Sequence, residues 1–361
     1  MGLFKKLFNK DKKVLKKGFV QLSIESITRE TKNAVAVSFS VPPEEKSNFK
    51  FIPGQYLNFA IEIDGKEIRR SYSICSGVNE SLTIAVKEVE DGTVSKWFNR
   101  EAKEGDLIWA STPQGSFTLT DAGKKYVAFA AGSGITPIMS IAKAIDLSQD
   151  GELNLYYSNK TEDNIIFHNQ LNSLSNSKIQ VKYLLSQEQK EGFNHGRFSK
   201  DKLTELIKEN IALLKADGFY ICGPEKMIVN TSEVLKTFGI SEDKIHYELF
   251  TPPVLLKSNE TEATATYTGL SRVTVILDDE EDTFDLETDG DTILDEVESY
   301  GIDAPFSCRG GICCTCKAKV LKGSARMDTN MALTDSEVEE GYILTCQAHP
   351  NSEEIVVSYD E

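Results

Sequence analysis

Four cysteines near the C-terminus constrain this chain more than any other feature. Cys308, Cys313 and Cys316 follow the pattern C-x4-C-x2-C, and Cys346 lies thirty residues further on. Two irons and two sulfides need four thiolates, and a close trio with one distant cysteine is the spacing of plant-type [2Fe–2S] clusters. A structural zinc site is the alternative, although such sites usually combine one CxxC with a second close pair. Cys314 would allow another register, and we interpret it as a non-ligand.

Acidic residues are unevenly distributed along the chain. The formal net charge is −16, and residues 271–361, with 22 Asp and Glu against 6 Lys and Arg, hold all of that excess. This distribution argues against binding of nucleic acid. It indicates either docking of the acidic segment on a basic protein surface or a simple gain in solubility.

A chain of 361 residues should form two or three domains. Between residues 19 and 122, short strand patterns separated by turns predict an antiparallel β-barrel. Between 123 and 250, strand and helix patterns alternate, which predicts a doubly wound parallel sheet. Residues 251–270 open with two prolines and continue polar, so we expect a flexible linker before a last domain at 271–361.

Residues 1–18 form a distinct basic segment with seven lysines and one aspartate. Its apolar residues recur at helical spacing, so an amphipathic helix on an anionic membrane and a solvated tail are both open. We find no apolar run long enough to cross a bilayer and no secretory signal. We therefore expect a cytoplasmic protein, or one that is peripheral at the inner face of the membrane.

Two short motifs lie within the predicted barrel. Arg70-Ser71-Tyr72-Ser73 combines a cation, two hydroxyls and an aromatic ring, which suits the phosphate, the polar edge and the rings of a flavin. About twenty residues later, Gly92-Thr93-Val94-Ser95 indicates a glycine turn that opens a helix and offers amides to a pyrophosphate. An ordinary strand and a plain helix cap are the alternatives.

Two further motifs lie in the strand–helix region. Gly132-Ser133-Gly134-Ile135-Thr136-Pro137 follows a strand and opens a helix, where a glycine-rich turn can receive a dinucleotide, although the third glycine of the Rossmann fingerprint is missing. Cys222-Gly223-Pro224 ends a later strand, at the edge where open α/β sheets bind ligands. A buried cysteine before a turn would look the same.

In their order along the chain, these motifs resemble one family. Together with Tyr157–Thr161, Glu248-Leu249-Phe250 and the cysteine loop, they are similar to the ferredoxin–NADP reductase superfamily with a fused C-terminal ferredoxin. Within it, the chain most resembles reductases of oxygenases, of the phenylacetyl-CoA epoxidase type. The resemblance implies a β-grasp (α+β) fold for the cysteine-bearing domain. It also implies electron transfer from NADPH, with NADH as the alternative, through FAD and the cluster to an oxygenase or desaturase partner.

The resemblance also implies roles for individual residues. It places FAD on the barrel, against Arg70, Ser71, Tyr72, Ser73, Gly92, Val94 and Ser95. It places NAD(P)H on the second domain, near Gly132, Gly134, Thr136, Ser158, Lys160, Cys222 and Gly223. Ser158 and Lys160 would select the adenosine 2′-phosphate, and no carboxylate lies between them to repel it. Cys222 and Glu248 would be the catalytic residues, beside the nicotinamide and the flavin, with Phe250 at the cofactor.

Three functions therefore remain open on the sequence. The first is a reductase for a soluble di-iron oxygenase. The second, suggested by the basic N-terminus, is a reductase for a membrane-bound desaturase or hydroxylase. The third is a redox sensor or carrier without steady reductase turnover. In the first two, we expect the linker to let the acidic domain visit the flavin and the partner in turn.

Overall fold

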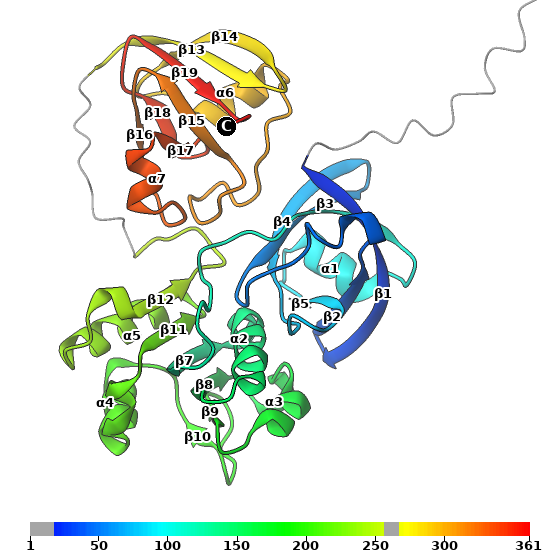
Figure 1. Cartoon of the computed structure of the whole chain (residues 1–361), viewed down its shortest axis with the longest axis vertical. Coiled ribbons are helices and arrows are strands. Elements are labelled where there is room, and N and C mark those ends of the chain that lie inside the picture. Colours follow the sequence, from blue (N-terminus) through cyan, green and yellow to red (C-terminus); the bar gives the residue numbers. More distant parts are fainter. Residues whose placement is uncertain (1–17, 256–266) are drawn as a thin grey trace, which may run out of the picture.

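The computed structural model describes residues 18–255 and 267–361. The predicted basic tail and most of the predicted linker lie outside these residues. The described chain folds into three units, a barrel, a parallel sheet between helices, and a smaller mixed sheet (Figure 1). No helix within the described ranges is both long and apolar enough to cross a bilayer.

The first unit is an antiparallel sheet of six strands in the order β4-β3-β6-β1-β2-β5. An isolated bridge between Ile74 and Ile84 joins its two edges, so the sheet curls into a barrel. The interior is filled by alternating apolar residues such as Leu57, Phe59 and Ile61, because successive side chains of a strand point to opposite faces. The elements are β1 Phe19–Thr31, β2 Ala34–Ser40, β3 Tyr56–Ile63, β4 Lys66–Ser73, β5 Leu82–Lys87, β6 Leu107–Ser111 and helix α1 Thr93–Arg100.

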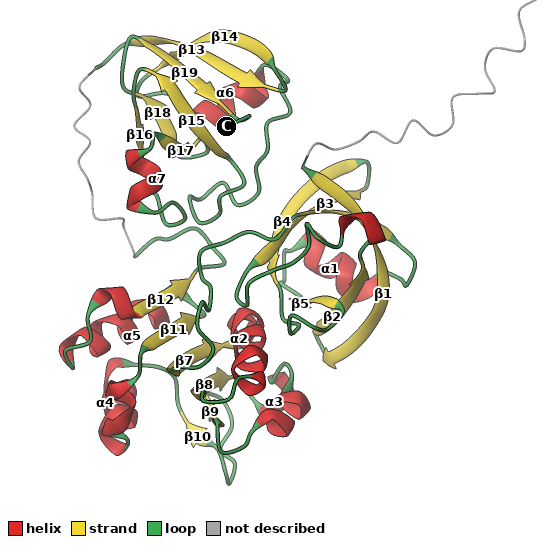
Figure 2. Cartoon of the chain, in the orientation of Figure 1, coloured by secondary structure: helices red, strands yellow, loops and turns green. Residues whose placement is uncertain are grey.

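The second unit is a parallel sheet of six strands in the order β10-β9-β8-β7-β11-β12. Helices cover both of its faces (Figure 2). The strand order reverses between β7 and β11, and open α/β sheets bind ligands at that point, beyond the carboxyl ends of the strands. The elements are β7 Lys125–Ala131, β8 Glu152–Asn159, β9 Ile179–Leu185, β10 Asn194–His195, β11 Gly218–Cys222, β12 Ile245–Glu248, and helices α2 Ile135–Leu147, α3 His168–Leu174, α4 Lys200–Glu209 and α5 Glu225–Thr237.

The third unit is a mixed sheet of five strands in the order β14-β13-β19-β15-β17, with β16 and β18 paired separately. β13 and β19 are parallel, and helix α6 buries Ile293, Leu294 and Val297 against the core of this unit. The cysteine loop lies between α6 and β15. The elements are β13 Leu270–Leu277, β14 Glu280–Glu287, β15 Lys317–Lys322, β16 Ala325–Met327, β17 Tyr342–Leu344, β18 Ala348–Pro350, β19 Glu354–Ser358, and helices α6 Ile293–Ser299 and α7 Asp335–Glu339.

The described ends of the predicted linker are attached to different units. The backbone amides of Val254 and Leu255 donate to Glu225 at the start of α5. On the other side, the amide of Gly269 donates to the Thr288 hydroxyl, and β13 begins one residue before the predicted start of the last domain. The fold class predicted from the sequence, with barrel, parallel sheet and small mixed sheet, is confirmed.

Candidate functional site

A cavity of about 620 Å³ lies where the three units meet. Side chains from β4, from the β5–α1 region, from the turn after β7 and from the chain after β12 line it, and so does the loop that carries Cys308 and Cys313. Motifs that are more than two hundred residues apart therefore share one wall. The cavity is large enough for a substantial part of a dinucleotide cofactor.

The Arg70–Ser73 motif forms the end of β4, and all four of its residues line the cavity. The hydroxyl of Ser71 donates to Asn58 Oδ1 at 2.6 Å, and the hydroxyl of Ser73 donates to Glu248 Oε2 at 3.2 Å. The ring of Tyr72 packs edge-on against Phe98 of α1 at 5.6 Å between centroids. These contacts hold the tyrosine ring in place. Arg70 is exposed and donates from Nη1 to the Arg69 carbonyl at 2.6 Å, so its other guanidinium N–H groups are available to an anionic ligand.

The second barrel motif begins helix α1, with Gly92 as its N-cap. The hydroxyl of Ser95 donates to the Gly92 carbonyl at 3.0 Å and accepts from the Val89 amide at 3.1 Å, so it ties the turn closed. Gly92, Val94 and Ser95 all line the cavity. The first turn of α1 contains no acidic residue, so the helix terminus can face negative charge.

The glycine-rich turn after β7 packs directly on the end of β11. A Cβ atom at Gly134 would lie 2.1 Å from the Cys222 carbonyl oxygen, so only glycine fits there. The hydroxyl of Tyr157 donates to the Gly132 carbonyl at 2.9 Å and fixes the other end of the turn. Ser133 and Thr136 line the cavity, whereas Gly132, Gly134, Cys222 and Gly223 do not. The turn therefore supports the wall of the cavity more than it forms it.

Ser158 and Lys160 lie at the end of β8, where the serine is buried and the lysine is exposed. The structure adds Lys87, which the motif analysis missed. Its Nζ would lie 3.4 Å from a Cβ atom at Gly132, and it lines the cavity from β5. Burial and the charge of Lys160 lower the pKa of Lys87, and Lys87 forms no ion pair among the described residues. Only the polar end of an otherwise apolar strand marks it in the sequence.

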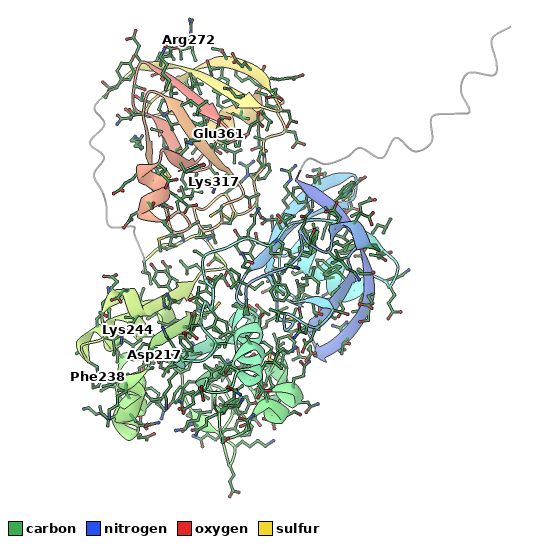
Figure 3. All side chains as sticks on the ribbon, viewed as in Figure 1. Asp217, Phe238, Lys244, Arg272, Lys317 and Glu361 are labelled. Atoms are coloured by element: carbon green, nitrogen blue, oxygen red, sulfur yellow. The ribbon has the colours of Figure 1, made fainter. Side chains whose placement is uncertain are left out.

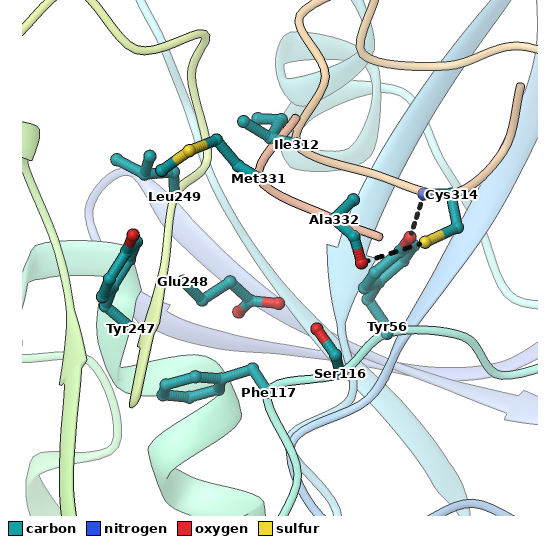
Figure 4. A pocket seen from close by; sticks show the side chains of 11 residues that line it. Tyr56, Ser116, Phe117, Tyr247, Glu248, Leu249, Ile312, Cys314, Met331 and Ala332 are labelled. Atoms are coloured by element: carbon teal, nitrogen blue, oxygen red, sulfur yellow. Dashed lines mark hydrogen bonds between the residues drawn. The ribbon is translucent and has the colours of Figure 1, made fainter. Parts of the chain in front are cut away.

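Glu248 ends β12 directly beside Cys222 in the β11–β12 register. Burial raises the pKa of Glu248 to about 8, against the opposing effect of the Ser73 hydrogen bond. Cys222 is fully buried, and burial followed by the charge of Glu248 raises the pKa of its thiol. Glu248 and Phe250 both line the large cavity. Figure 4 shows the Glu248 side chain facing Tyr56 and Ser116 across a smaller pocket at the same junction.

The four cysteines of the predicted cluster come together. The thiol of Cys313 donates to Cys308 Sγ at 3.1 Å, and contacts from the thiols of Cys313 and Cys346 lower the pKa of Cys308. Cys346 also contacts Cys316. Cys314 turns away, and its thiol donates to the Ala332 carbonyl at 3.6 Å. Within the described residues, no three His, Cys, Asp or Glu side chains form a site for a single metal ion.

Backbone amides surround these sulfurs. The amides of Gly310 and Ile312 point to Cys308, and that of Gly311 points to Cys346. Amide hydrogen bonds to sulfur are a recurring feature of iron–sulfur sites. Four thiols with amide donors fit a [2Fe–2S] cluster. The cavity, with its arginine, hydroxyls, aromatic ring and helix terminus, fits FAD.

Three family models match successive parts of the chain. An oxidoreductase FAD-binding domain matches residues 21–119, an oxidoreductase NAD-binding domain matches 129–233, and a 2Fe-2S iron-sulfur cluster binding domain matches 275–351. The chain belongs to the family of FAD- and NAD-binding ferredoxin reductases that carry a C-terminal [2Fe–2S] ferredoxin domain. We refer to the three units below as the FAD, NAD and ferredoxin domains.

Among its relatives is one of the subunits of the 1,2-phenylacetyl-CoA epoxidase of Escherichia coli strain K12. The two chains are 34% identical over 352 residues, which cover 95% of this chain and 98% of that protein. The 3-ketosteroid-9-alpha-monooxygenase ferredoxin reductase component of Mycobacterium tuberculosis is 30% identical over 368 residues, with 95% and 96% covered. The solved structure of phthalate dioxygenase reductase shares the fold, with a TM-score of 0.59 at 23% identity, and covers 94% of this chain and 98% of that one.

These findings confirm the activity class and the cofactors predicted from the sequence. The protein is an NAD(P)H-dependent oxidoreductase of the ferredoxin-reductase type, with FAD and a [2Fe–2S] cluster. The domain match at residues 275–351 favours the cluster over the zinc alternative.

Proposed function

We propose that this protein passes electrons from NADPH through FAD and its cluster to the oxygenase component of a system of the phenylacetyl-CoA epoxidase type. The observation that carries this proposal is the shared cavity, because Tyr72, Glu248 and Cys308, one residue from each domain, line it together. The names of the relatives support an oxygenase as the acceptor. When bound, the flavin accepts a hydride and releases single electrons, which suits a plant-type cluster at about −400 mV.

We assign the cluster to the thiolates of Cys308, Cys313, Cys316 and Cys346. Their mutual contacts and the amides directed at Cys308 and Cys346 support this choice. For FAD we assign the residues that line the cavity from the FAD domain, namely Arg70, Ser71, Tyr72, Ser73, Gly92, Val94 and Ser95. In this assignment, the guanidinium group of Arg70 and the start of α1 meet the phosphates, and Tyr72 faces the flavin rings.

We assign the nicotinamide nucleotide to the turn after β7 and to the ends of β8 and β11. Thr136 and Glu248 both line the shared cavity, and in this assignment these two side chains would flank the nicotinamide. The backbone of Cys222 and Gly223 packs against the turn at Gly134. Ser158 and Lys160, with Lys87 approaching Gly132 from the FAD domain, provide two cations and a hydroxyl for phosphate groups.

The nucleotide preference follows from these cations. Because no carboxylate lies between Ser158 and Lys160, we expect kcat/KM for NADPH to exceed that for NADH. In Lys160→Glu, kcat/KM for NADPH should fall roughly tenfold, the value of one charge-assisted contact, while that for NADH changes less than about twofold. Reduction of cytochrome c with each nucleotide measures both. A wild-type preference for NADH would contradict the assignment.

The same assay separates a reductase from a carrier. Steady reduction of cytochrome c over many turnovers is expected of a reductase, and its absence would contradict the proposed function. Addition of the phenylacetyl-CoA epoxidase oxygenase component and phenylacetyl-CoA then tests the acceptor through product formation. If cytochrome c is reduced but no product forms, the acceptor belongs to a different system.

A further inference from the structure

Arg69, next to the flavin motif, lies at the contact between the FAD and ferredoxin domains. Its side chain is only 8% exposed. The guanidinium group donates to Glu67 Oε1 at 2.7 Å within β4, and to Asp303 Oδ1 at 3.0 Å and the Ala304 carbonyl at 3.2 Å in the ferredoxin domain. It also lies 5.2 Å from the centre of the Phe306 ring. One buried cation thus joins the two domains.

Arg69 also has contacts within the FAD domain that do not depend on the ferredoxin domain. A buried cation is costly unless it keeps hydrogen-bonded partners. When the ferredoxin domain leaves, Arg69 loses Asp303, Ala304 and Phe306, but Glu67 and the ring of Phe19, at 5.7 Å, are on its own domain. The arginine is therefore paired in both states.

On the ferredoxin side, the same separation leaves a receptor for a cation. It consists of the Asp303 carboxylate and the Ala304 carbonyl, beside the Phe306 ring, which also has Arg309 of its own domain at 4.4 Å, and Asp303 is already 85% exposed. A carboxylate, a carbonyl and an aromatic face are the groups that bind a guanidinium or ammonium ion in proteins. This receptor directly precedes Cys308 in the chain, within a domain region of net charge −16.

Docking of the ferredoxin domain also covers the cysteine loop. The hydroxyls of Ser71 and Ser307 are 3.0 Å apart, and the Cys314 amide donates to the Tyr56 hydroxyl at 3.2 Å (Figure 4). A Cβ atom at Gly310 would lie 2.5 Å from the Pro252 ring. A second protein cannot occupy this face of the loop while the FAD and NAD domains cover it.

We infer that the external acceptor binds the ferredoxin face formed by Asp303, Ala304 and Phe306, and places a basic side chain where Arg69 lies in the docked state. Internal docking and acceptor binding are then mutually exclusive uses of one surface. The inference rests on the proposed function and names the chemistry of the partner, a protein with an arginine or lysine near its electron entry point.

The test uses cytochrome c, a basic protein, as the probe and measures its binding to the oxidised holoprotein at low salt without nucleotide. Asp303→Asn should weaken binding roughly two- to fivefold, as for an exposed ion pair. Arg69→Ala should tighten binding, because the competing internal ligand is gone and more of the protein is in the competent state. Asp285→Asn is the matched control, since it removes the same charge from an exposed pair with Arg272, at the outer end of the domain (Figure 3).

Two results would overturn the inference. Equal weakening by Asp303→Asn and Asp285→Asn would show attraction by net charge alone, and unchanged or weaker binding by Arg69→Ala would place the acceptor elsewhere. If Arg69→Ala does not fold, Arg69→Lys retains the positive charge without the forked guanidinium group and should tighten binding less.

Small-angle scattering provides a second readout, in which Arg69→Ala should be more extended than wild type and Asp285→Asn should not. Binding is measured without turnover, so failure of the proposed reductase function would show separately.

Discussion

Glu248 is a residue whose chemistry depends strongly on its surroundings. Its side chain lies at the junction of the domains, and its carboxylate accepts a hydrogen bond from Ser73. Burial disfavours the charged form more than this single bond favours it, which raises its pKa from 4.5 to about 8. At neutral pH the group is therefore mostly protonated and able to donate a hydrogen bond into the cavity.

This pKa predicts a pH-dependent contribution of Glu248 to stability. A carboxyl with a raised pKa in the folded state stabilises below its unfolded pKa, and that contribution is lost as pH rises through the folded value. Relative to Glu248→Gln, the wild type should lose up to about 5 kcal/mol between about pH 4.5 and about pH 9, with little further change above. Thermal denaturation across this range measures the difference.

Glu209→Gln provides the control for that experiment, because it removes an exposed carboxylate at the end of α4. Its stability should follow that of the wild type at every pH. A gap between Glu248→Gln and wild type that does not change with pH would show that Glu248 is solvated in solution.

The conformation of the cysteine loop distinguishes between two candidate ligands that the cysteine spacing leaves open. Cys313 and Cys314 are neighbours, so either could complete the trio with Cys308 and Cys316. The thiol of Cys313 faces Cys308, whereas the thiol of Cys314 faces the Ala332 carbonyl. The backbone amide of Cys314 donates a hydrogen bond to the Tyr56 hydroxyl. These contacts hold the loop backbone from two sides, and they favour the register that includes Cys313 over the one that includes Cys314.

We therefore expect Cys314→Ser to assemble a normal cluster and Cys313→Ser to assemble none or an unstable one. The physical reason is the direction of the side chain, because only Cys313 joins the other three sulfurs. Visible absorption and the content of iron and sulfide measure the outcome. Loss of the cluster in Cys314→Ser, with retention in Cys313→Ser, would show that the other register is used.

At the scale of the whole molecule, we propose that the chain between the NAD and ferredoxin domains lets the cluster meet more than one partner. The amides of Val254 and Leu255 form hydrogen bonds with Glu225 of α5, and the amide of Gly269 forms one with Thr288 of the ferredoxin domain. The part of the predicted linker between these anchors lies outside the described residues. A flexible linker of about twenty residues would span roughly 25 Å on average.

Replacement of residues 256–266 by a proline-rich stretch of equal length should lower turnover with an external acceptor several-fold. Proline-rich chains are semi-rigid spacers, so the ferredoxin domain would exchange positions less freely. A glycine–serine stretch of equal length is the control and should preserve turnover. Stopped-flow absorbance distinguishes reduction of the cluster from reduction of the acceptor, and equal acceptor rates in the two replacements would contradict the moving-domain hypothesis.

Much of the local structure could be predicted from the sequence alone. The alternation of strands and helices predicted between residues 123 and 250 is present as β7 to β12 and α2 to α5, and the turn at Gly132–Gly134 opens α2 as expected. Strand β4 could not be predicted beyond its flavin motif, because its first residues are charged and lack clear alternation. Helix α3 could not be predicted because it is short and polar.

The sequence by itself determined the chemistry and the order of the parts, since cysteine spacing, glycine turns and apolar periodicity are local properties of the chain. Only the tertiary structure decided which of those parts meet. Arg69 and Asp303 are 234 residues apart, and Lys87 reaches Gly132 from another domain. Such contacts depend on how whole domains pack, and no local pattern records the direction in which a side chain will find its partner.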